Sequence, residues 1–252
     1  MSLIISPRTT GYVRTAFIDV FALHPVQNNK FWHGNFSENF YEGPDTVKVL
    51  FTGYSGAVVG QAIYEYASHY LSDDPLPEIY FVGGVYAFRD SALNVGDIVY
   101  ARDTFSPNSF EQNVYDNTFD RGIENVSKPD PILLTKILKV AKAKTIKIKP
   151  AKVYCDIDFG YYPDFDDPKQ LMNEAMWWKL SLTSIPKDGF NSGDYESAAA
   201  LATSKLFEIP AVALMDVKYK RYSETDYKVA TSEQKNKALN NILTILHDVL
   251  IE

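Results

Sequence analysis

Apolar side chains switch repeatedly along the chain between the spacing of a strand and the spacing of a helix. Residues 47–52, Val-Lys-Val-Leu-Phe-Thr, form a short β-branched and aromatic run that stops at the glycines of residues 53–56. The apolar positions that follow repeat at helical spacing, at Val58, Val59, Ala62, Ile63, Tyr66 and Ala67. This order predicts a strand, a glycine turn and a helix.

The same alternation continues to the C-terminus. Apolar runs predict strands at residues 3–5, 79–82, 95–100 (after a turn) and 210–215, and bent or paired strands at residues 146–155, which Pro150 interrupts. Helical spacing and capping residues predict helices from about 129 to 143, from 196 to 207 and from 232 to 250. We therefore expect one α/β domain over residues 1–252, with a mixed, mainly parallel central sheet flanked by helices.

Two long segments, residues 103–126 and 156–193, show no clean period. Structureless connections of that length are uncommon in compact domains and are often functional. We expect both segments to be functional loops.

Charge and composition narrow the class of protein. The formal net charge is −7 and the pI about 5.2, which argues against a general nucleic-acid surface, because phosphate backbones are held mainly by Lys and Arg. No apolar run approaches the roughly 18 residues of a membrane span. Cys155 is the single cysteine and no signal peptide opens the chain, so we expect a reducing, cytoplasmic compartment and a small-molecule partner.

Two glycine pairs follow predicted strands. Gly53 and Gly56 come after the first, and Gly83-Gly84 after the second. We expect turns at the carboxyl ends of strands, where ligands bind and exposed N–H groups hold anions. The alternative is that the glycines only permit tight turns. Residues 52–60 do not match G-x-G-x-x-G, so no nicotinamide cofactor is expected.

Ser55 provides an alternative chemistry. Residues 53–57, Gly-Tyr-Ser-Gly-Ala, approach the G-x-S-x-G elbow of serine hydrolases, between a predicted strand and helix. Such a serine needs a histidine base later in the chain. The two later histidines, His69 and His247, both fall within predicted helices. The four histidines have no metal-ligand spacing, so no metal site is expected.

Three acidic residues near the C-terminal third are candidates for catalysis. Asp194 and Glu196 lie at the start of a predicted helix, where capping explains Asp194 better than Glu196. Asp216 follows the apolar strand 211–215, and an acid in such desolvated surroundings suits general-acid catalysis. The alternative is that Asp216 only caps the end of the strand.

Taken together, these segments resemble the nucleoside phosphorylase and nucleosidase family, over residues 31 to 252. The resemblance rests on six segments: Trp32-His33-Gly34 ahead of the first glycine turn, Phe81-Val82-Gly83-Gly84-Val85-Tyr86, Leu93-Asn94-Val95-Gly96-Asp97-Ile98-Val99, Pro129-Asp130-Pro131 through Lys152-Val153-Tyr154, Tyr195-Glu196-Ser197-Ala198-Ala199, and Leu214-Met215-Asp216. The resemblance implies cleavage of the N-glycosidic bond of a nucleoside, with a purine favoured, by phosphorolysis or hydrolysis. It also implies a homo-oligomer, a dimer or hexamer.

The resemblance implies a role for each matching residue. Glu196 is expected to bind the ribose hydroxyls, with Tyr195 under the sugar, and Asp216 to protonate or hydrogen-bond purine N7. Phe159 or Tyr161, with Tyr162 as another candidate, is expected to stack on the base. Gly53, Gly83 and Gly84 are expected to line the substrate site.

The chain departs from the family where phosphorylases bind phosphate. Phe81 and Gly84 stand where they carry an arginine and a serine or threonine, and Tyr86 stands where a third glycine is usual. The N-terminal phosphate loop is absent, with Ser6-Pro7-Arg8 in its place. A nucleoside-binding protein without efficient turnover is therefore a second hypothesis.

Basic residues elsewhere could replace the missing phosphate ligands. Arg8, or the cluster Lys218, Lys220 and Arg221, would serve if it folded into the site, whereas a solvated basic face is the alternative. We expect turnover to depend only weakly on phosphate as a co-substrate unless one of these groups reaches the site. No other cofactor is expected.

Overall fold

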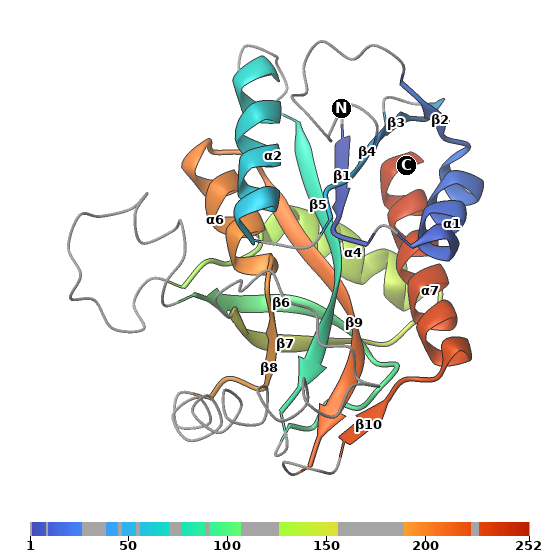
Figure 1. Ribbon diagram of the computed structural model, residues 1–252, viewed down its shortest axis with the longest axis vertical. Helices are drawn as coiled ribbons and strands as arrows, with labels where there is room; N and C mark the ends of the chain where they lie inside the picture. The colour runs from blue at the N-terminus through green and yellow to red at the C-terminus, as the bar shows by residue number, and fades with distance from the viewer. Residues whose placement is uncertain are drawn as a thin grey trace, which may run out of the picture.

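The computed structural model describes residues 2–8, 10–26, 39–44, 47–53, 56–70, 77–88, 91–106, 126–155, 189–222 and 227–251. Within them, ten strands form one mixed sheet, in the order β10-β9-β6-β7-β8-β5-β1-β4-β3-β2 (Figure 1). Four neighbouring strands run parallel and form its centre: β4 (Val47–Phe51), β1 (Ser2–Ser6), β5 (Glu78–Ala87) and β9 (Ala211–Arg221). This part of the sheet carries the predicted parallel arrangement.

The remaining strands extend the sheet with mixed pairing. They are β2 (His24–Pro25), β3 (Phe40–Glu42), β6 (Ile98–Phe105), β7 (Ile148–Cys155), β8 (Ser192–Asp194) and β10 (Tyr227–Val229). β5 pairs with both β8 and β9, so β5, β9, β6, β7 and β8 close into a ring. The ring forms the lower half of the molecule in Figure 1.

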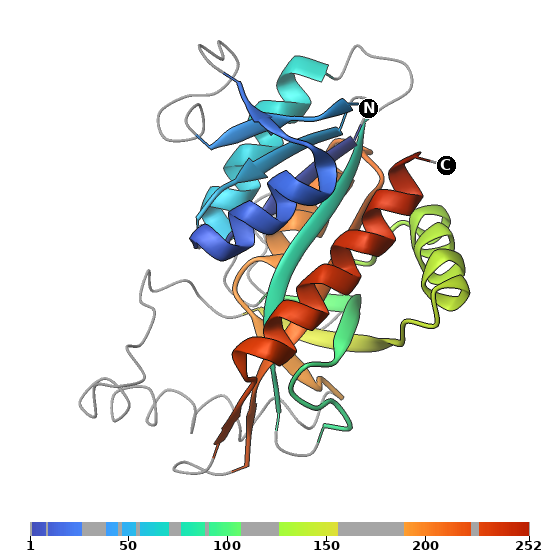
Figure 2. The same cartoon turned by 90° about the vertical axis from the view of Figure 1, so that its right-hand side faces the viewer.

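Helices cover both faces of the sheet, as expected. Figure 1 shows α2 (Gly56–Tyr70) and α6 (Ser197–Leu206) on one side, and α1 (Gly11–Phe21) and α7 (Ser232–Ile251) on the other. α4 (Pro131–Ala143) packs with α7 on the second side, and Figure 2 shows α7 and α4 from there. Each layer has its own buried cluster.

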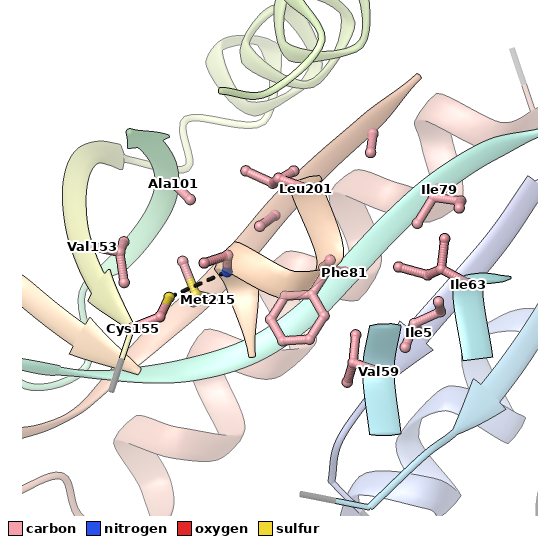
Figure 3. Close-up of a cluster of buried hydrophobic side chains, with 14 of the residues drawn as sticks. Ile5, Val59, Ile63, Ile79, Phe81, Ala101, Val153, Cys155, Leu201 and Met215 are labelled. Atoms are coloured by element: carbon pink, nitrogen blue, oxygen red, sulfur yellow. Dashed lines mark hydrogen bonds between the residues drawn. The ribbon is translucent and has the colours of Figure 1, made fainter. Parts of the chain in front are cut away.

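Alternation along the strands divides the core between the two faces. In β1, Leu3 and Ile5 belong to the cluster under α2 and α6, whereas Ile4 belongs to the cluster under α1, α4 and α7. Successive strand side chains point to opposite faces, so a strand covered on both sides is apolar throughout. Figure 3 shows part of the first cluster, with Ile5 and Phe81 among its members.

Most predicted elements are confirmed, with small shifts at their ends. The helix after Ser127 begins at Pro131, because the Asp130 carboxylate accepts hydrogen bonds from the N–H groups of Ile132 and Leu133, both at 2.9 Å. It ends at Ala143, as expected. The helices predicted at 196–207 and 232–250 are α6 and α7.

Three predictions about strands are wrong. Gly83-Gly84 is not a turn, because β5 continues through both glycines to Ala87 while paired with β9. Asp216 does not end its strand, because β9 continues to Arg221. Pro150 does not break β7, which runs from Ile148 to Cys155. β8 pairs only with the residues of β7 from Val153 onward, so the N–H that proline lacks costs no hydrogen bond to β8.

The two segments predicted as loops lie mostly outside the described residues. Of those that are described, Asp103–Phe105 finish β6 and Ser192 begins β8. Among the described helices, none is long and apolar enough to cross a membrane.

Candidate functional site

The centre of the candidate site is a buried ion pair. The Arg8 guanidinium, just beyond β1, donates through Nη2 to Asp216 Oδ1 in β9 and to the carbonyl oxygen of Gly83 in β5. Arg8 is 4% exposed and Asp216 1%. An adjacent guanidinium favours the ionised form of a carboxylate. The other Asp216 oxygen, Oδ2, is buried and accepts no hydrogen bond from the described residues.

Gly84 makes room for this pair. It lies opposite Asp216 in the β5–β9 register, and a Cβ on it would lie 2.8 Å from Arg8 Nη2 and in collision with Lys218 Cε. A side chain here would displace two cationic groups. The glycine is therefore needed for close approach inside a strand and not for a turn.

Lys218 is a second basic residue of the site. Burial is the largest cause that lowers the pKa of its ammonium group well below the ordinary value. The charge of Arg8 lowers it further, and the carboxylate of Glu196 acts in the opposite direction. Lys218 thus connects the Arg8–Asp216 pair electrostatically with Glu196.

Glu196 is buried at the start of α6. It is 2% exposed and occupies the N-cap position, but its side chain makes no capping hydrogen bond. Asp194 does the capping, because the N–H of Ser197 donates to Asp194 Oδ2 at 3.1 Å. As the sequence indicated, capping accounts for Asp194 and does not account for the Glu196 carboxylate.

Gly56, at the start of α2, lies against this segment. A Cβ on Gly56 would lie 2.8 Å from the backbone oxygen of Tyr195, so the first turn of α2 contacts the turn that carries Glu196. Gly53 has a φ of +77°, the left-handed region that glycine adopts without strain. The residues after β1 and β4 thus lie near those of α6 and β9.

Asp194 belongs to a second, neutral cluster. The Cys155 thiol donates to Asp194 Oδ1 at 2.7 Å, and the N–H of Ala198 donates to Cys155 Sγ at 3.2 Å. Burial is the main cause that raises the pKa of Asp194 to about 6, and the hydrogen bonds from Cys155 and Ser197 lower it in part.

Solved structures with the same fold act on nucleosides, as their names state. The sequence matches no protein-family model and no curated protein sequence. The structure is similar to a 5′-methylthioadenosine/S-adenosyl homocysteine nucleosidase of Campylobacter jejuni, with 15% identity and a TM-score of 0.66, over 98% of this chain and 97% of that one. It is also similar to a putative enzyme of that type from Borrelia burgdorferi bound to adenine, with 16% identity and a TM-score of 0.67, over 100% and 99%.

A third similar structure is a purine nucleoside phosphorylase of Toxoplasma gondii in complex with immucillin-H, with 15% identity and a TM-score of 0.66, over 99% and 89%. The chain has the nucleoside phosphorylase fold. The fold expected from the sequence resemblance is therefore confirmed, and at these identities the likeness concerns the fold.

Within the nucleoside phosphorylase fold, the predicted site residues fall into two groups. The described ones are Glu196, Asp216, Tyr195, Gly53, Gly83 and Gly84, and contacts among the strand ends and α6 bring them to one region. Phe159, Tyr161, Tyr162 and Ser55 lie outside the described residues. The base-stacking and nucleophile roles of these four remain predictions.

Neither prediction for the basic cluster Lys218, Lys220 and Arg221, a group folded into the site or a solvated face, holds for all of its residues. Lys218 reaches the site, whereas Lys220 is buried elsewhere and donates to the carbonyl oxygens of Ser91 and Leu93 at 2.7 and 2.8 Å. The solvated basic face is therefore wrong for Lys220. The side chain of Arg221 lies outside the described residues.

Ser55 and the side chain of His69 lie outside the described residues, so the serine hydrolase hypothesis stays a prediction. His247 lies 3.5 Å from Asp248 Oδ1 and packs against the Phe21 ring, in the layer of α1 and α7. The described residues hold no group of three or more His, Cys, Asp or Glu side chains suited to a metal ion.

Proposed function

We propose that this protein cleaves the N-glycosidic bond of a nucleoside, with a purine as the favoured base. The observation that carries the proposal is the pair of buried carboxylates, Glu196 and Asp216, set beside the basic side chains of Arg8 and Lys218 in a nucleoside phosphorylase fold. The named activities of the similar structures support the reaction class. A buried carboxylate that does not cap its helix is suited to bind the hydroxyls of a sugar.

The proposed reaction has two electrostatic requirements. The sugar becomes cationic as the bond breaks, and the Glu196 carboxylate stabilises that charge while accepting hydrogen bonds from the ribose hydroxyls. The base takes the bonding electrons and needs a partner for its charge. Asp216 and Arg8 contact each other, and Asp216 Oδ2, which accepts no hydrogen bond from the described residues, is the atom that would accept a base N–H in the proposed reaction.

Water or phosphate completes the reaction at the sugar. The sequence predicts weak phosphate dependence unless Arg8 or the cluster Lys218, Lys220 and Arg221 folds into the site. Arg8 contacts Asp216, and Arg8 and Lys218 both lie against Gly84, which supports a role for these two side chains in binding phosphate. Phosphate is therefore a chemically feasible acceptor, because cationic groups offset the burial of its charge.

Release of free base is the direct test. Purified protein is incubated with a panel of purine and pyrimidine nucleosides, with and without phosphate, and free base is followed by chromatography. We expect release from at least one purine nucleoside and a loss of about a hundredfold or more in Glu196→Gln. Glu65→Gln is the matched control, because Glu65 is a buried glutamate of α2 that pairs with Gln61 at 2.9 Å. No release from any nucleoside would sink the proposal.

Binding without turnover is the second candidate, and one observation favours it. Arg8 contacts Asp216, the carboxylate to which the sequence resemblance gives the role of binding the base. Calorimetry separates the two candidates: a nucleoside that binds in the micromolar range and is returned intact supports the binding protein.

The proposal includes assembly into a homo-oligomer, a dimer or hexamer, in the cytoplasm. Two large apolar side chains on the helices α2 and α6 remain exposed, Tyr64 at 52% and Leu206 at 41%, and the Tyr64 ring contacts Phe207. Aromatic residues are enriched at protein interfaces. Sedimentation at micromolar concentration tests the assembly, and a purely monomeric mass contradicts it.

A further inference from the structure

We propose that α4 and the residues beside its ends present a binding surface for an anionic lipid membrane. The surface consists of four exposed lysines and one exposed isoleucine, and we call it the lysine surface: Lys128, Ile132, Lys139, Lys142 and Lys147. The inference goes beyond the proposed reaction and does not depend on it, because none of these residues belongs to the candidate site.

Positive charge is concentrated in this part of the chain. Residues 128–152 contain eight lysines and a single acid, Asp130, which gives the segment a formal charge of +7 in a chain whose net charge is −7. Charges separated by more than about 10 Å are largely screened from each other at ordinary salt. An acidic protein can therefore bind an anionic membrane through one face on which its lysines gather.

The packing of α4 turns this charge outward. Ile137 and Val140 are buried in the cluster that α4 shares with α7. Ile132, Lys139 and Lys142 follow one another at intervals of about two turns and one turn, and all three are exposed on the opposite face of the helix. Figure 2 shows α4 (yellow-green) at the periphery of the molecule beside α7 (red). The outward face of α4 is therefore accessible to a large flat partner.

The lysines of this surface have no acidic partner, whereas other lysines of the segment do. Three lysines are held in ion pairs of 2.5 to 3.1 Å: Lys136 by Glu78, Lys144 by Asp248 and Lys149 by Asp97. Within the part of the chain that the structure describes, no ion pair involves any of the four others: Lys128, Lys139, Lys142 and Lys147. Their charges remain for anionic groups outside the chain.

The helix dipole explains only one of these lysines. Lys142 lies in the last turn of α4, where a cation is favoured. Lys128 lies two positions before the N-cap residue Asp130, beside the helix end that disfavours a cation. Lys139 lies one turn from Lys142, and like charges at such spacing destabilise a helix. An anionic partner offsets both unfavourable interactions.

Ile132 gives the lysine surface an apolar anchor. It is 68% exposed, more than any other large apolar side chain of the described residues. Removing such a side chain from water is favourable, and neighbouring lysines can lay their methylene stems along an apolar surface while their ammonium groups stay at the phosphates. Lysines combined with exposed apolar side chains are typical of helices that bind the membrane interface.

The composition favours lipid over nucleic acid or a protein partner. Residues 128–152 contain no arginine and no aromatic residue. Proteins that bind nucleic acids use arginine and aromatic side chains to contact the bases. Protein interfaces are enriched in the same residues and depleted in lysine. By contrast, clusters of about four to eight basic residues bind anionic lipid headgroups through their charge.

Vesicle binding tests the lysine surface directly. The full chain is sedimented with vesicles of phosphatidylcholine alone and with vesicles that also contain phosphatidylserine. We expect binding only to the vesicles with phosphatidylserine, and weaker binding as salt is added. Lys139→Glu/Lys142→Glu should bind at least about tenfold more weakly, since each lysine close to an anionic surface strengthens binding about fivefold.

Further variants make the result specific to this surface. Lys128→Glu/Lys147→Glu changes the lysine surface outside α4, so it should weaken binding to a similar extent with the helix unaltered. Ile132→Ser should weaken binding by a smaller factor, about fivefold. Lys228→Glu/Lys237→Glu is the matched control, because it makes the same change of charge at exposed lysines of β10 and α7. The control should bind as wild type does.

The outcomes that would overturn the proposal are equally definite. One is the absence of binding, or equal binding to both kinds of vesicle. Another is an equal loss of binding in the control variant. A third is tighter binding to a DNA duplex than to the phosphatidylserine vesicles at equal concentration of anionic groups, which would assign the surface to nucleic acid. Circular dichroism checks that each variant folds as wild type does.

Discussion

Asp194 and Asp216 are both buried aspartates near the start of α6 and in β9, 2% and 1% exposed, yet their partners differ in kind. Asp194 is held by neutral donors, the Cys155 thiol and the Ser197 N–H. Asp216 is held by the charge of Arg8. Neutral donors only partly offset the cost of burying a carboxylate, and the pKa of Asp194 rises to about 6.

In our proposal, the two aspartates have different roles: Asp194 has a structural role, and Asp216 has a role in the reaction. The cluster of Asp194, Cys155 and Ser197 joins β7 to α6 and so holds the turn that presents Glu196. The pair of Arg8 and Asp216 leaves one buried carboxylate oxygen, Oδ2, without a hydrogen bond from the described residues. In our proposal, Asp194 therefore supports the fold of the site, whereas Asp216 lies next to the ligand.

Removing the cation should have the largest effect on stability. Arg8→Met leaves the Asp216 carboxylate buried without its partner, and breaking a buried pair in this way lowers the free energy of unfolding by about 3–5 kcal/mol. Urea denaturation measures it. Arg102→Met, in a half-exposed pair, should cost less than about 1 kcal/mol. A similar small loss in Arg8→Met would show that the pair does not stabilise the fold.

The Asp194 cluster should show itself through pH. The pKa of the Asp194 carboxyl is about 6 in the folded state and 3.8 ordinarily, so the folded protein holds this proton more tightly than the unfolded chain does. The stabilisation is complete below pH 3.8 and is lost as pH rises through about 6. The difference between the two pKa values corresponds to about 3 kcal/mol in the free energy of unfolding. Asp194→Asn should remove this part of the pH dependence in urea titrations between pH 4 and about pH 7, and an unchanged slope would contradict the assignment.

Two glycines test which contacts are rigid. In Gly56→Ala the new Cβ would lie 2.8 Å from the Tyr195 backbone oxygen, so the backbone must move. We expect the free energy of unfolding to fall by about 1–3 kcal/mol. In Gly84→Ala the Cβ meets the flexible ends of Lys218 and Arg8. Thermal unfolding should show the smaller loss for Gly84→Ala, while base release falls more in that variant. The reverse order would place Gly84 in the support of the fold.

The smallest expected effect concerns the thiol. Cys155→Ala removes a donor to Asp194 and an acceptor for the Ala198 N–H, which should lower the free energy of unfolding by about 1 kcal/mol. Cys155→Ser keeps both hydrogen-bonding functions and is the control. Chemical denaturation at pH 7 compares them, and equal stability of wild type and Cys155→Ala would remove the thiol from the cluster.

Local pattern predicted the elements that carry strong periodicity. The strand at 47–52 and the helices α2, α4, α6 and α7 follow from apolar spacing and caps. α1 escaped prediction, although Val13, Phe17 and Phe21 are spaced by one helical turn and are buried. That spacing was a usable signal.

The errors in the strands have one physical cause. Glycine and aspartate usually interrupt strands. Here β5 and β9 form a long parallel pair, in which Gly83 and Gly84 of β5 lie opposite Met215 and Asp216 of β9. Tertiary pairing determined the conformation, and local propensity did not. Glu196 and Asp216 were recognisable as candidates, whereas the partner of Asp216 was not, because nothing near it in sequence points to Arg8.

The closed ring of strands has a consequence for the order of biosynthesis. Arg8 and Asp216 are 208 residues apart, and β5, which pairs with β1 near its own start, must wait for β8 and β9 before its other two neighbours exist. A growing chain emerges from the ribosome at about 5–20 residues per second, so β1, β4 and β5 leave the exit tunnel many seconds before β9. During that interval β5 presents an apolar edge, a known route to aggregation. Production of this protein should therefore respond to chaperones that bind nascent chains, and a chain truncated before β9 should be captured by them.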